Sequence, residues 1–141
     1  MTKPKILFLC TGNSARSQMA EAFVRKYAGD RFEAYSAGLE PKGLNPLTVK
    51  VMNEIGVDVS EQKSKNINTY LGKIKFQYLV TVCDDADKNC PTGIPGVDQR
   101  MHWSFEDPAA LGGTEEEKLT KFREVRDRIE KKVKNWLAEQ G

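Results

Sequence analysis

The stretch Cys10-Thr11-Gly12-Asn13-Ser14-Ala15-Arg16-Ser17 directly follows the apolar run Ile6-Leu7-Phe8-Leu9, and together they decide the fold. A short, continuous apolar run is typical of a strand buried on both faces of a parallel sheet. The small and polar residues after it predict a tight loop, and the spacing of Met19, Phe23 and Tyr27 predicts a helix from about residue 18. We therefore expect a strand, a loop and a helix in succession.

A loop of this kind predicts an anion site. Successive backbone N–H groups between a strand and a helix stay unpaired and can surround a tetrahedral oxyanion. Arg16 adds a planar guanidinium that can bind two oxygens at once. The expected oxyanion-binding residues are Thr11, Gly12, Asn13, Ser14, Ala15 and Arg16.

Cys10 stands at the mouth of this loop and is the candidate nucleophile. The N-terminus of a helix favours negative charge, so we expect the thiol to be largely ionised near neutral pH. Ser17 either caps the helix or donates its hydroxyl to the Cys10 sulfur, and both roles are open.

Length and composition restrict the class of protein. The 141 residues fit a single domain, residues 1–141, which can bury an ordinary core without metal or disulfides. The net charge of +2 gives no indication of nucleic acid or of an acidic membrane surface as a partner. No apolar run approaches the roughly 18 residues that cross a membrane. We expect a cytoplasmic protein, in which three cysteines are catalytic or redox groups and form no disulfide framework.

The remaining pattern alternates strands and helices. Further strands are predicted at residues 32–36, 78–82 and 98–103, and helices at 46–55, at about 67–71 and from Thr114 onward. Asn45-Pro46 is a good start for the second helix, and Thr114 with Glu117 forms a capping box for the last. This order predicts an α/β fold with a central, mostly parallel four-stranded sheet between helices in a three-layer sandwich. Ligands of such folds bind at the carboxyl ends of the strands, where Cys10 and Cys83 both stand.

Cys83 and Cys90 are separated by six mostly polar residues, in a segment that we expect to be exposed. A helical course would hold their Cα atoms about 10 Å apart, so a disulfide would require rearrangement. Zinc binding and two unrelated thiols are the alternatives, but the spacing does not suit zinc and the chain has one histidine. Asp107, before Pro108, is a candidate general acid on a loop, although Asp-Pro alone is a turn signal.

Several motifs together resemble the thioredoxin-coupled arsenate reductases, which share the fold and anion loop of low-molecular-weight protein tyrosine phosphatases. The matching segments are residues 10–21, 35–38, 83–91 and 102–108. The resemblance implies that Cys10 attacks arsenate while Asp107 helps to expel water. It further implies a Cys10–Cys83 disulfide as arsenite leaves, and then a Cys83–Cys90 disulfide that thioredoxin reduces. We expect a monomer with no tightly bound cofactor and no metal.

The resemblance leaves two questions open. Some relatives bind potassium through residues like Asn13, Glu21 and Ser36 and an acidic residue where Lys65 stands, so we expect this chain to lack that site. A phosphatase that works through a Cys10 phosphocysteine is the chief alternative, although Ala109-Ala110 offers no aromatic wall for an aryl ring. A thiol sensor without turnover is the third possibility.

Overall fold

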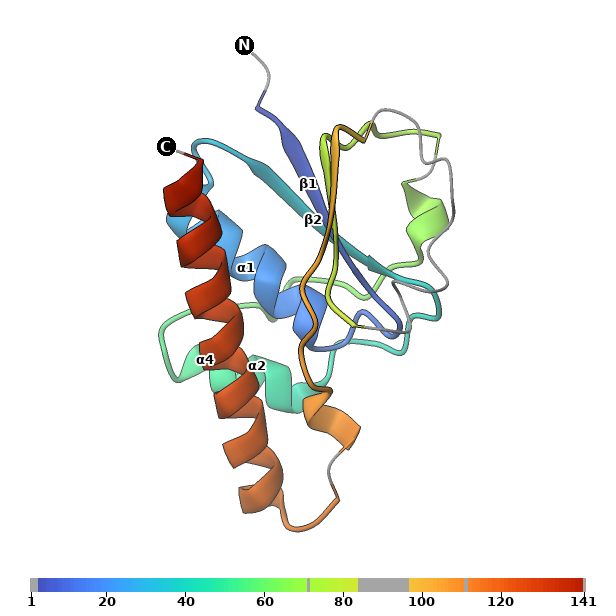
Figure 1. Cartoon of the computed structure of the whole chain (residues 1–141). Coiled ribbons are helices and arrows are strands. Elements are labelled where there is room, and N and C mark those ends of the chain that lie inside the picture. Colours follow the sequence, from blue (N-terminus) through green and yellow to red (C-terminus); the bar gives the residue numbers. More distant parts are fainter. Residues whose placement is uncertain (1–2, 71, 84–96, 111, 141) are drawn as a thin grey trace.

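The computed structural model of the chain describes residues 3–70, 72–83, 97–110 and 112–140. Its centre is a four-stranded sheet in the order β2-β1-β3-β4, and every pair of neighbours is parallel. The strands are β1 (Lys5–Cys10), β2 (Glu33–Gly38), β3 (Tyr78–Thr81) and β4 (Gln99–His102). The predicted α/β fold is confirmed, and the described sheet is parallel throughout (Figure 1).

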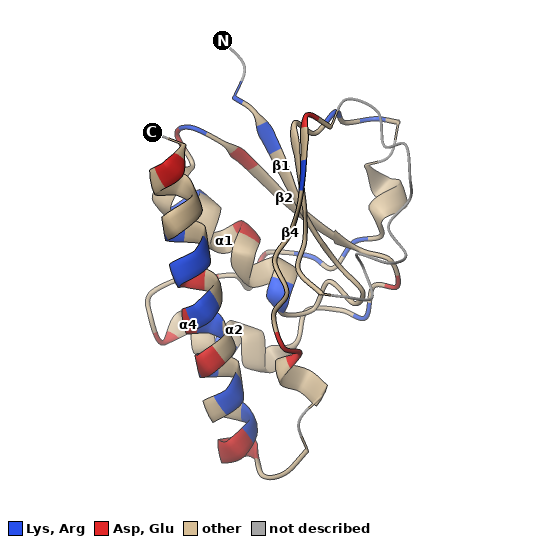
Figure 2. Ribbon diagram, viewed as in Figure 1, with Lys and Arg blue, Asp and Glu red and all other residues tan. Residues whose placement is uncertain are grey.

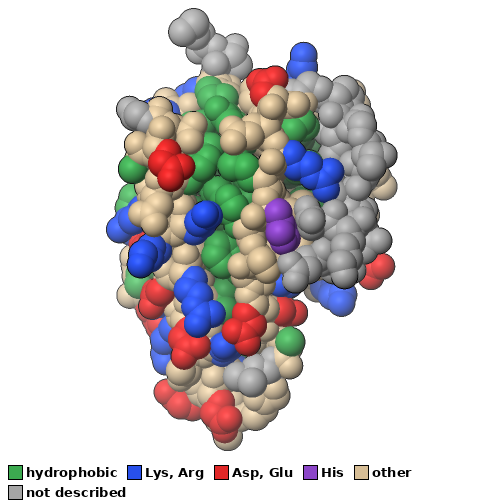
Figure 3. Space-filling model, in the orientation of Figure 1, with side chains coloured by type: hydrophobic (Ala, Val, Ile, Leu, Met, Phe, Trp, Pro, Cys, Tyr) green, Lys and Arg blue, Asp and Glu red, His purple; other side chains and the backbone are tan. Residues whose placement is uncertain are grey.

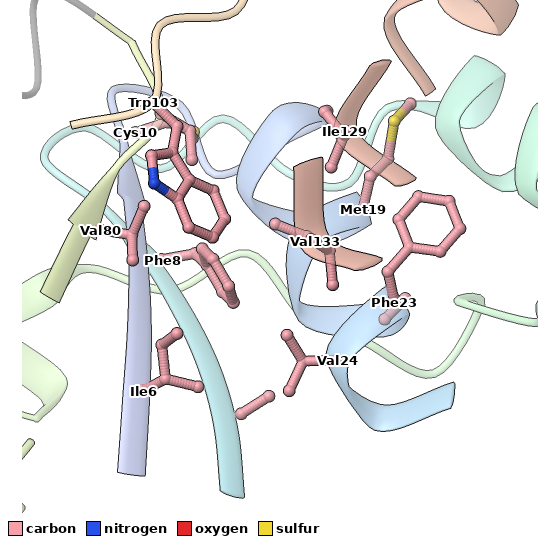
Figure 4. Packing of buried hydrophobic residues seen from close by; sticks show 14 of the residues in the cluster. Ile6, Phe8, Cys10, Met19, Phe23, Val24, Val80, Trp103, Ile129 and Val133 are labelled. Atoms are coloured by element: carbon pink, nitrogen blue, oxygen red, sulfur yellow. The ribbon is translucent and has the colours of Figure 1, made fainter. Parts of the chain in front are cut away.

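Three helices lie together on one side of the sheet (Figure 1). They are α1 (Arg16–Ala28), α2 (Pro46–Asn53) and α4 (Glu115–Glu139). Alternate residues of β1, Ile6 and Phe8, point toward Phe23 and Val24 of α1 (Figure 4). All four of these side chains are fully buried, so the helices cover the sheet by apolar packing.

The other side of the sheet is covered in part by a stretch that contains a short 3-10 helix, η1 (Ile67–Thr69). Tyr70 and Phe76 from this stretch each pack against Tyr35 of β2, with ring centroids 5.4 and 5.3 Å away. The helix predicted at about residues 67–71 is present as this single 3-10 turn, which is shorter than expected, and residue 71 lies outside the described residues. Asn66 begins the turn by accepting a hydrogen bond from Asn68 N, and Tyr70 closes it.

Helix α4 has a buried apolar face and a charged outer face. Its apolar stripe, from Leu119 to Trp136, is buried, and Thr114 caps it by accepting the Glu117 N–H at 3.2 Å. Its outer face carries lysine and arginine interspersed with aspartate and glutamate (Figure 2). A strip of hydrophobic side chains is visible beside the charged ones in the space-filling view (Figure 3). No helix within the described residues is both long and apolar enough to span a membrane.

The strand register brings the two cysteines to one edge of the sheet. Leu9 of β1 pairs with Thr81 of β3, and Val82 N donates to Leu9 O at 2.9 Å. Cys10, the last residue of β1, and Cys83, two residues beyond β3, therefore both lie at the carboxyl edge of the sheet.

Candidate active site

The loop after β1 is held from outside by the segment that follows β2. Residues 39–45 donate backbone N–H groups to four carbonyls of the loop, those of Cys10, Thr11, Gly12 and Ser14, at 2.8–3.2 Å. In a trans peptide the carbonyl and the next N–H point in opposite directions. The N–H groups that follow these carbonyls are therefore turned toward the interior of the loop, as an oxyanion nest requires.

Cys10 lies inside this nest with only 2% of its surface exposed. Its sulfur accepts the N–H of Asn13 at 3.2 Å and lies 3.0 Å from the hydroxyl oxygen of Ser17. Both groups can donate to a thiolate, which is the ionised form that attacks. The geometry thus supports Cys10 as the nucleophile.

One of the two roles predicted for Ser17 is wrong. Helix α1 begins at Arg16, its N-cap is Ala15, and no side chain caps it. Ser17 lies within the helix, fully buried, with its hydroxyl directed to Cys10. The first N–H groups of the helix face the anion loop, so a side-chain cap would compete with the ligand there.

Arg16 and Asp107 form the opposite wall of the pocket. The guanidinium of Arg16 donates to the carbonyl of Phe105 at 3.1 Å and lies 3.8 Å from the Asp107 carboxylate. Asp107 also accepts the N–H of Ala109 at 2.9 Å, which is the turn that Asp-Pro signals. Its side chain is 44% exposed and lines the same pocket as Cys10. A carboxyl in this place can reach a ligand that Arg16 binds.

Cys83 lies beside the first cysteine and is buried, with 4% of its surface exposed. The polar residues after Cys83, which we expected to be exposed, lie outside the described residues, and Cys83 itself is buried two residues beyond β3. Its sulfur is 3.5 Å from the hydroxyl of Thr11, a residue of the Cys10 loop. Cys10 and Cys83 are both reduced cysteines in this structure. Cys90 and the predicted Cys83–Cys90 pair lie outside the described residues.

Three residues around the site carry no local sequence signal. Lys42 lines the pocket, and its stem packs beside Gly12. Gln18 supports the loop from behind by donating a hydrogen bond to Asn13 O, and Gln62 donates in turn to Gln18. Lys42 and Gln62 come from loops without periodicity, so only the fold brings them to the site.

The residues behind the loop do not fit the potassium ion that some relatives bind. The side-chain oxygen of Asn13 already accepts the Lys65 N–H at 2.8 Å, and Glu21 accepts bonds from Ser36 at 2.6 Å and Arg25 at 2.7 Å. The Lys65 ammonium donates to the carbonyl of Lys63. Burial lowers the pKa of Lys65, opposed by the charge of Glu21. Elsewhere, within the part of the chain that is described, no cluster of three His, Cys, Asp or Glu side chains suits a metal.

Comparison with known proteins gives the family. The family model of the low molecular weight phosphotyrosine protein phosphatases matches residues 5–140. An arsenate reductase of Halalkalibacterium halodurans is 51% identical over 141 residues, which are 100% of this chain and 99% of that one.

Two solved structures extend this comparison. An arsenate reductase in its oxidized state superposes with a TM-score of 0.82 at 28% identity, covering 97% of this chain and 98% of that one. A thioredoxin-dependent arsenate reductase of Corynebacterium glutamicum gives a TM-score of 0.72 at 26% identity, covering 97% of this chain and 61% of that one. The chain therefore belongs to the low molecular weight phosphotyrosine protein phosphatase family, in the branch that holds these arsenate reductases.

Proposed function

We propose that this protein reduces arsenate to arsenite with three cysteines and thioredoxin as the electron donor. The observation that carries the proposal is the pair of buried thiols at neighbouring strand ends, one of them inside an anion loop. A phosphatase needs only the first of these thiols. The relatives named as arsenate reductases, one of them thioredoxin-dependent, support the choice.

In the first step arsenate binds to the amides of the loop and to Arg16. The Cys10 thiolate attacks arsenic, a sulfur–arsenic bond forms, and one arsenic–oxygen bond breaks. Asp107 gives a proton to the departing oxygen, which leaves as water. Ser17 and the Asn13 N–H hold the sulfur in place for the attack.

In the second step the Cys83 thiolate attacks the sulfur of Cys10. A Cys10–Cys83 disulfide forms, and the electron pair of the broken sulfur–arsenic bond stays on arsenic, which leaves as arsenite. Cys90 then attacks the Cys83 sulfur, so that Cys10 is released and a Cys83–Cys90 disulfide remains. Two electrons from thioredoxin return this disulfide to thiols.

The test is arsenate-dependent oxidation of NADPH in the presence of thioredoxin and thioredoxin reductase. Serine at Cys83 or at Cys90 should abolish multiple turnovers, since each thiol is consumed in the relay. Hydrolysis of an aryl phosphate by the same samples is the control, because it requires neither residue. Reduction that continues in both variants would contradict the relay.

The alternative function is phosphate ester hydrolysis through a Cys10 phosphocysteine. The anion loop and Asp107 favour it, since the same groups serve phosphoryl transfer. After Asp107, however, the 3-10 helix η2 (Pro108–Ala110) presents the exposed methyl groups of Ala109 and Ala110 and no aromatic ring. We therefore propose weak phosphatase activity at most. Rapid hydrolysis of a phosphate ester without arsenate reduction would make the phosphatase the better supported function.

We also propose that the Lys65 ammonium stands in place of the potassium ion bound by some relatives. Its place behind the loop, near the charge of Glu21, supports this. Potassium and sodium chloride at equal ionic strength should then stabilise and activate the protein equally. A potassium-specific rise in the unfolding temperature would contradict it.

We further propose that residues 1–141 form one domain and that the protein is a cytoplasmic monomer. Sedimentation at two protein concentrations tests the monomer directly.

A further inference from the structure

We propose that Gln62 and Gln18 are positioning residues that act on Cys10 through Asn13 and Ser17. The inference rests on the proposed role of Cys10 as nucleophile. It adds Gln62 and Gln18 to the residues that support Cys10. Neither residue lines the anion pocket, and Gln62 lines a separate polar cavity on the far side of the loop.

The four side chains form one continuous chain of hydrogen bonds that ends on the sulfur. Gln62 Nε2 donates to Gln18 Oε1 at 2.7 Å, and Gln18 Nε2 donates to Asn13 Oδ1 at 3.1 Å. Asn13 Nδ2 donates to Ser17 Oγ at 2.8 Å, and Ser17 Oγ lies 3.0 Å from Cys10 Sγ.

Backbone groups of fixed polarity determine the direction of each bond. Gln62 Nε2 also donates to the carbonyl of Gln18. Gln18 Nε2 also faces the carbonyls of Asn13 and Lys63, so its two hydrogens serve three acceptors and one hydrogen is shared between two of them. The Lys65 N–H donates to Asn13 Oδ1. A carbonyl only accepts and a backbone N–H only donates, so none of the three amides can be reversed without losing a bond.

The consequence for Ser17 is direct. Its oxygen accepts from Asn13, so its own hydrogen is left to point at the Cys10 sulfur. Chains of hydrogen bonds that run in one direction strengthen one another in a low-dielectric interior. Gln18, Asn13 and Ser17 are all fully buried, so the bonds that join these three side chains are shielded from water, whereas the bond from Gln62 is part-buried.

Gln18 also holds the backbone of the loop. Asn13 has a φ of 48°, in the left-handed region that non-glycine residues rarely adopt. The bond from Gln18 Nε2 to Asn13 O holds the Asn13–Ser14 peptide, which adjoins the Gly12–Asn13 peptide whose N–H is donated to the sulfur. Gln62 fixes Gln18 in turn, from a loop 44 residues away in the sequence.

The test measures Cys10 alone, in protein with serine at Cys83 and Cys90. Gln62→Leu removes the first donor at nearly constant volume, and Gln99→Leu makes the same change on the exposed strand β4 as a matched control. The ultraviolet absorbance of the thiolate gives the midpoint, the pH at which half of Cys10 is ionised. The rate of alkylation at mildly acid pH gives the reactivity of Cys10. Arg16, Lys42 and Asp107, the charged groups named in the pocket, are the same in every variant.

We expect Gln62→Leu to raise the midpoint by about half a pH unit and to slow alkylation about threefold to fivefold, as loss of one hydrogen bond predicts. Gln99→Leu should change neither. The effect should also become smaller in a Ser17→Ala background, because the side-chain route to the sulfur runs through that hydroxyl. An unchanged midpoint in Gln62→Leu, or an effect of equal size without Ser17, would overturn the inference. The assay uses no arsenate and no thioredoxin, so its result does not depend on whether the protein reduces arsenate.

Discussion

The carboxyl ends of β1 and β3 each carry a buried cysteine, but the two thiols have different surroundings. Cys10 lies in a closed loop whose carbonyls are bonded from outside, and its sulfur contacts Asn13 N and Ser17. Cys83 stands at the end of the neighbouring strand, within 3.5 Å of the Thr11 hydroxyl.

This difference separates two chemical tasks. The loop around Cys10 is organised for an oxyanion, because its N–H groups and Arg16 converge on one place. Cys83 contacts that loop at Thr11, and in the relay proposed above it attacks the first sulfur once arsenic is bound there. The comparison therefore predicts that variants around each cysteine affect different steps.

The largest effect is expected for Cys10→Ser. Loss of the nucleophile should reduce both arsenate reduction and any aryl phosphate hydrolysis by at least about 1,000-fold. Steady-state assays of both reactions measure this, with Cys83→Ser as the control that keeps hydrolysis. If Cys10→Ser kept a few per cent of either activity, Cys10 would not be the nucleophile, and the difference in task between Cys10 and Cys83 would not hold.

Asp107→Asn should have the next largest effect. Without the acid, the step at Cys10 should slow about 100-fold, which single-turnover mixing with arsenate measures. Glu106→Gln is the matched control, since this carboxylate lies at the same pocket but is held in an ion pair with Lys121 of α4 at 2.6 Å. Equal losses in the two variants would show that charge, and not proton transfer, is responsible.

Ser17→Ala tests the Cys10 side of the comparison alone. Removing a hydrogen bond to a thiolate should slow alkylation of Cys10 about tenfold. The rate at which Cys83 reacts with a small disulfide should stay within about twofold. If both rates fall together, the two strand ends do not act independently.

Thr11→Val is the counterpart for Cys83, with a smaller expected effect. Its hydroxyl is 3.5 Å from the Cys83 sulfur, so its loss should slow disulfide formation with Cys10 about threefold. Stopped-flow measurement of arsenite release after the first step separates this from arsenate binding. An effect confined to binding would assign Thr11 to the oxyanion site only.

The smallest effect concerns Lys65, which supports the Cys10 loop from behind. Burial lowers its pKa below the ordinary 10.5, so the unfolded chain binds this proton more tightly than the folded one. Between the folded pKa and about 10.5, wild type should therefore gain stability relative to Lys65→Met as the pH rises. Urea unfolding of both proteins at several pH values measures the difference, and a constant difference would show that Lys65 does not titrate in this window.

Strong local patterns were enough to predict most of the fold. The Thr114 start of α4 and the Asn45-Pro46 start of α2 are confirmed, since each depends on neighbours in sequence. Strand β2 runs to Gly38, two residues beyond its predicted end, because Gly38 pairs with Cys10 and forms a bridge with Asn66. A glycine has no side chain to show such pairing in advance.

The site divides in the same way. The Cys10 loop and Arg16 were readable because one short segment contains them. The start of α1 at Arg16 was missed, since the helix uses no capping side chain and ordinary start signals do not apply. Gln62 and Lys42 were missed because long-range contacts alone bring them to the loop.

The aromatic packing between the sheet and α4 gives the protein an internal optical probe. Its two tryptophans, Trp103 and Trp136, lie with ring centroids 6.1 Å apart, and Phe8 and Phe32 contact them. Trp103 follows β4 and precedes the Asp107 wall by four residues. Both emitters therefore report from one place, the joint between the longest helix and the strand that leads to the pocket. Fluorescence can follow the docking of this helix during folding without any added label.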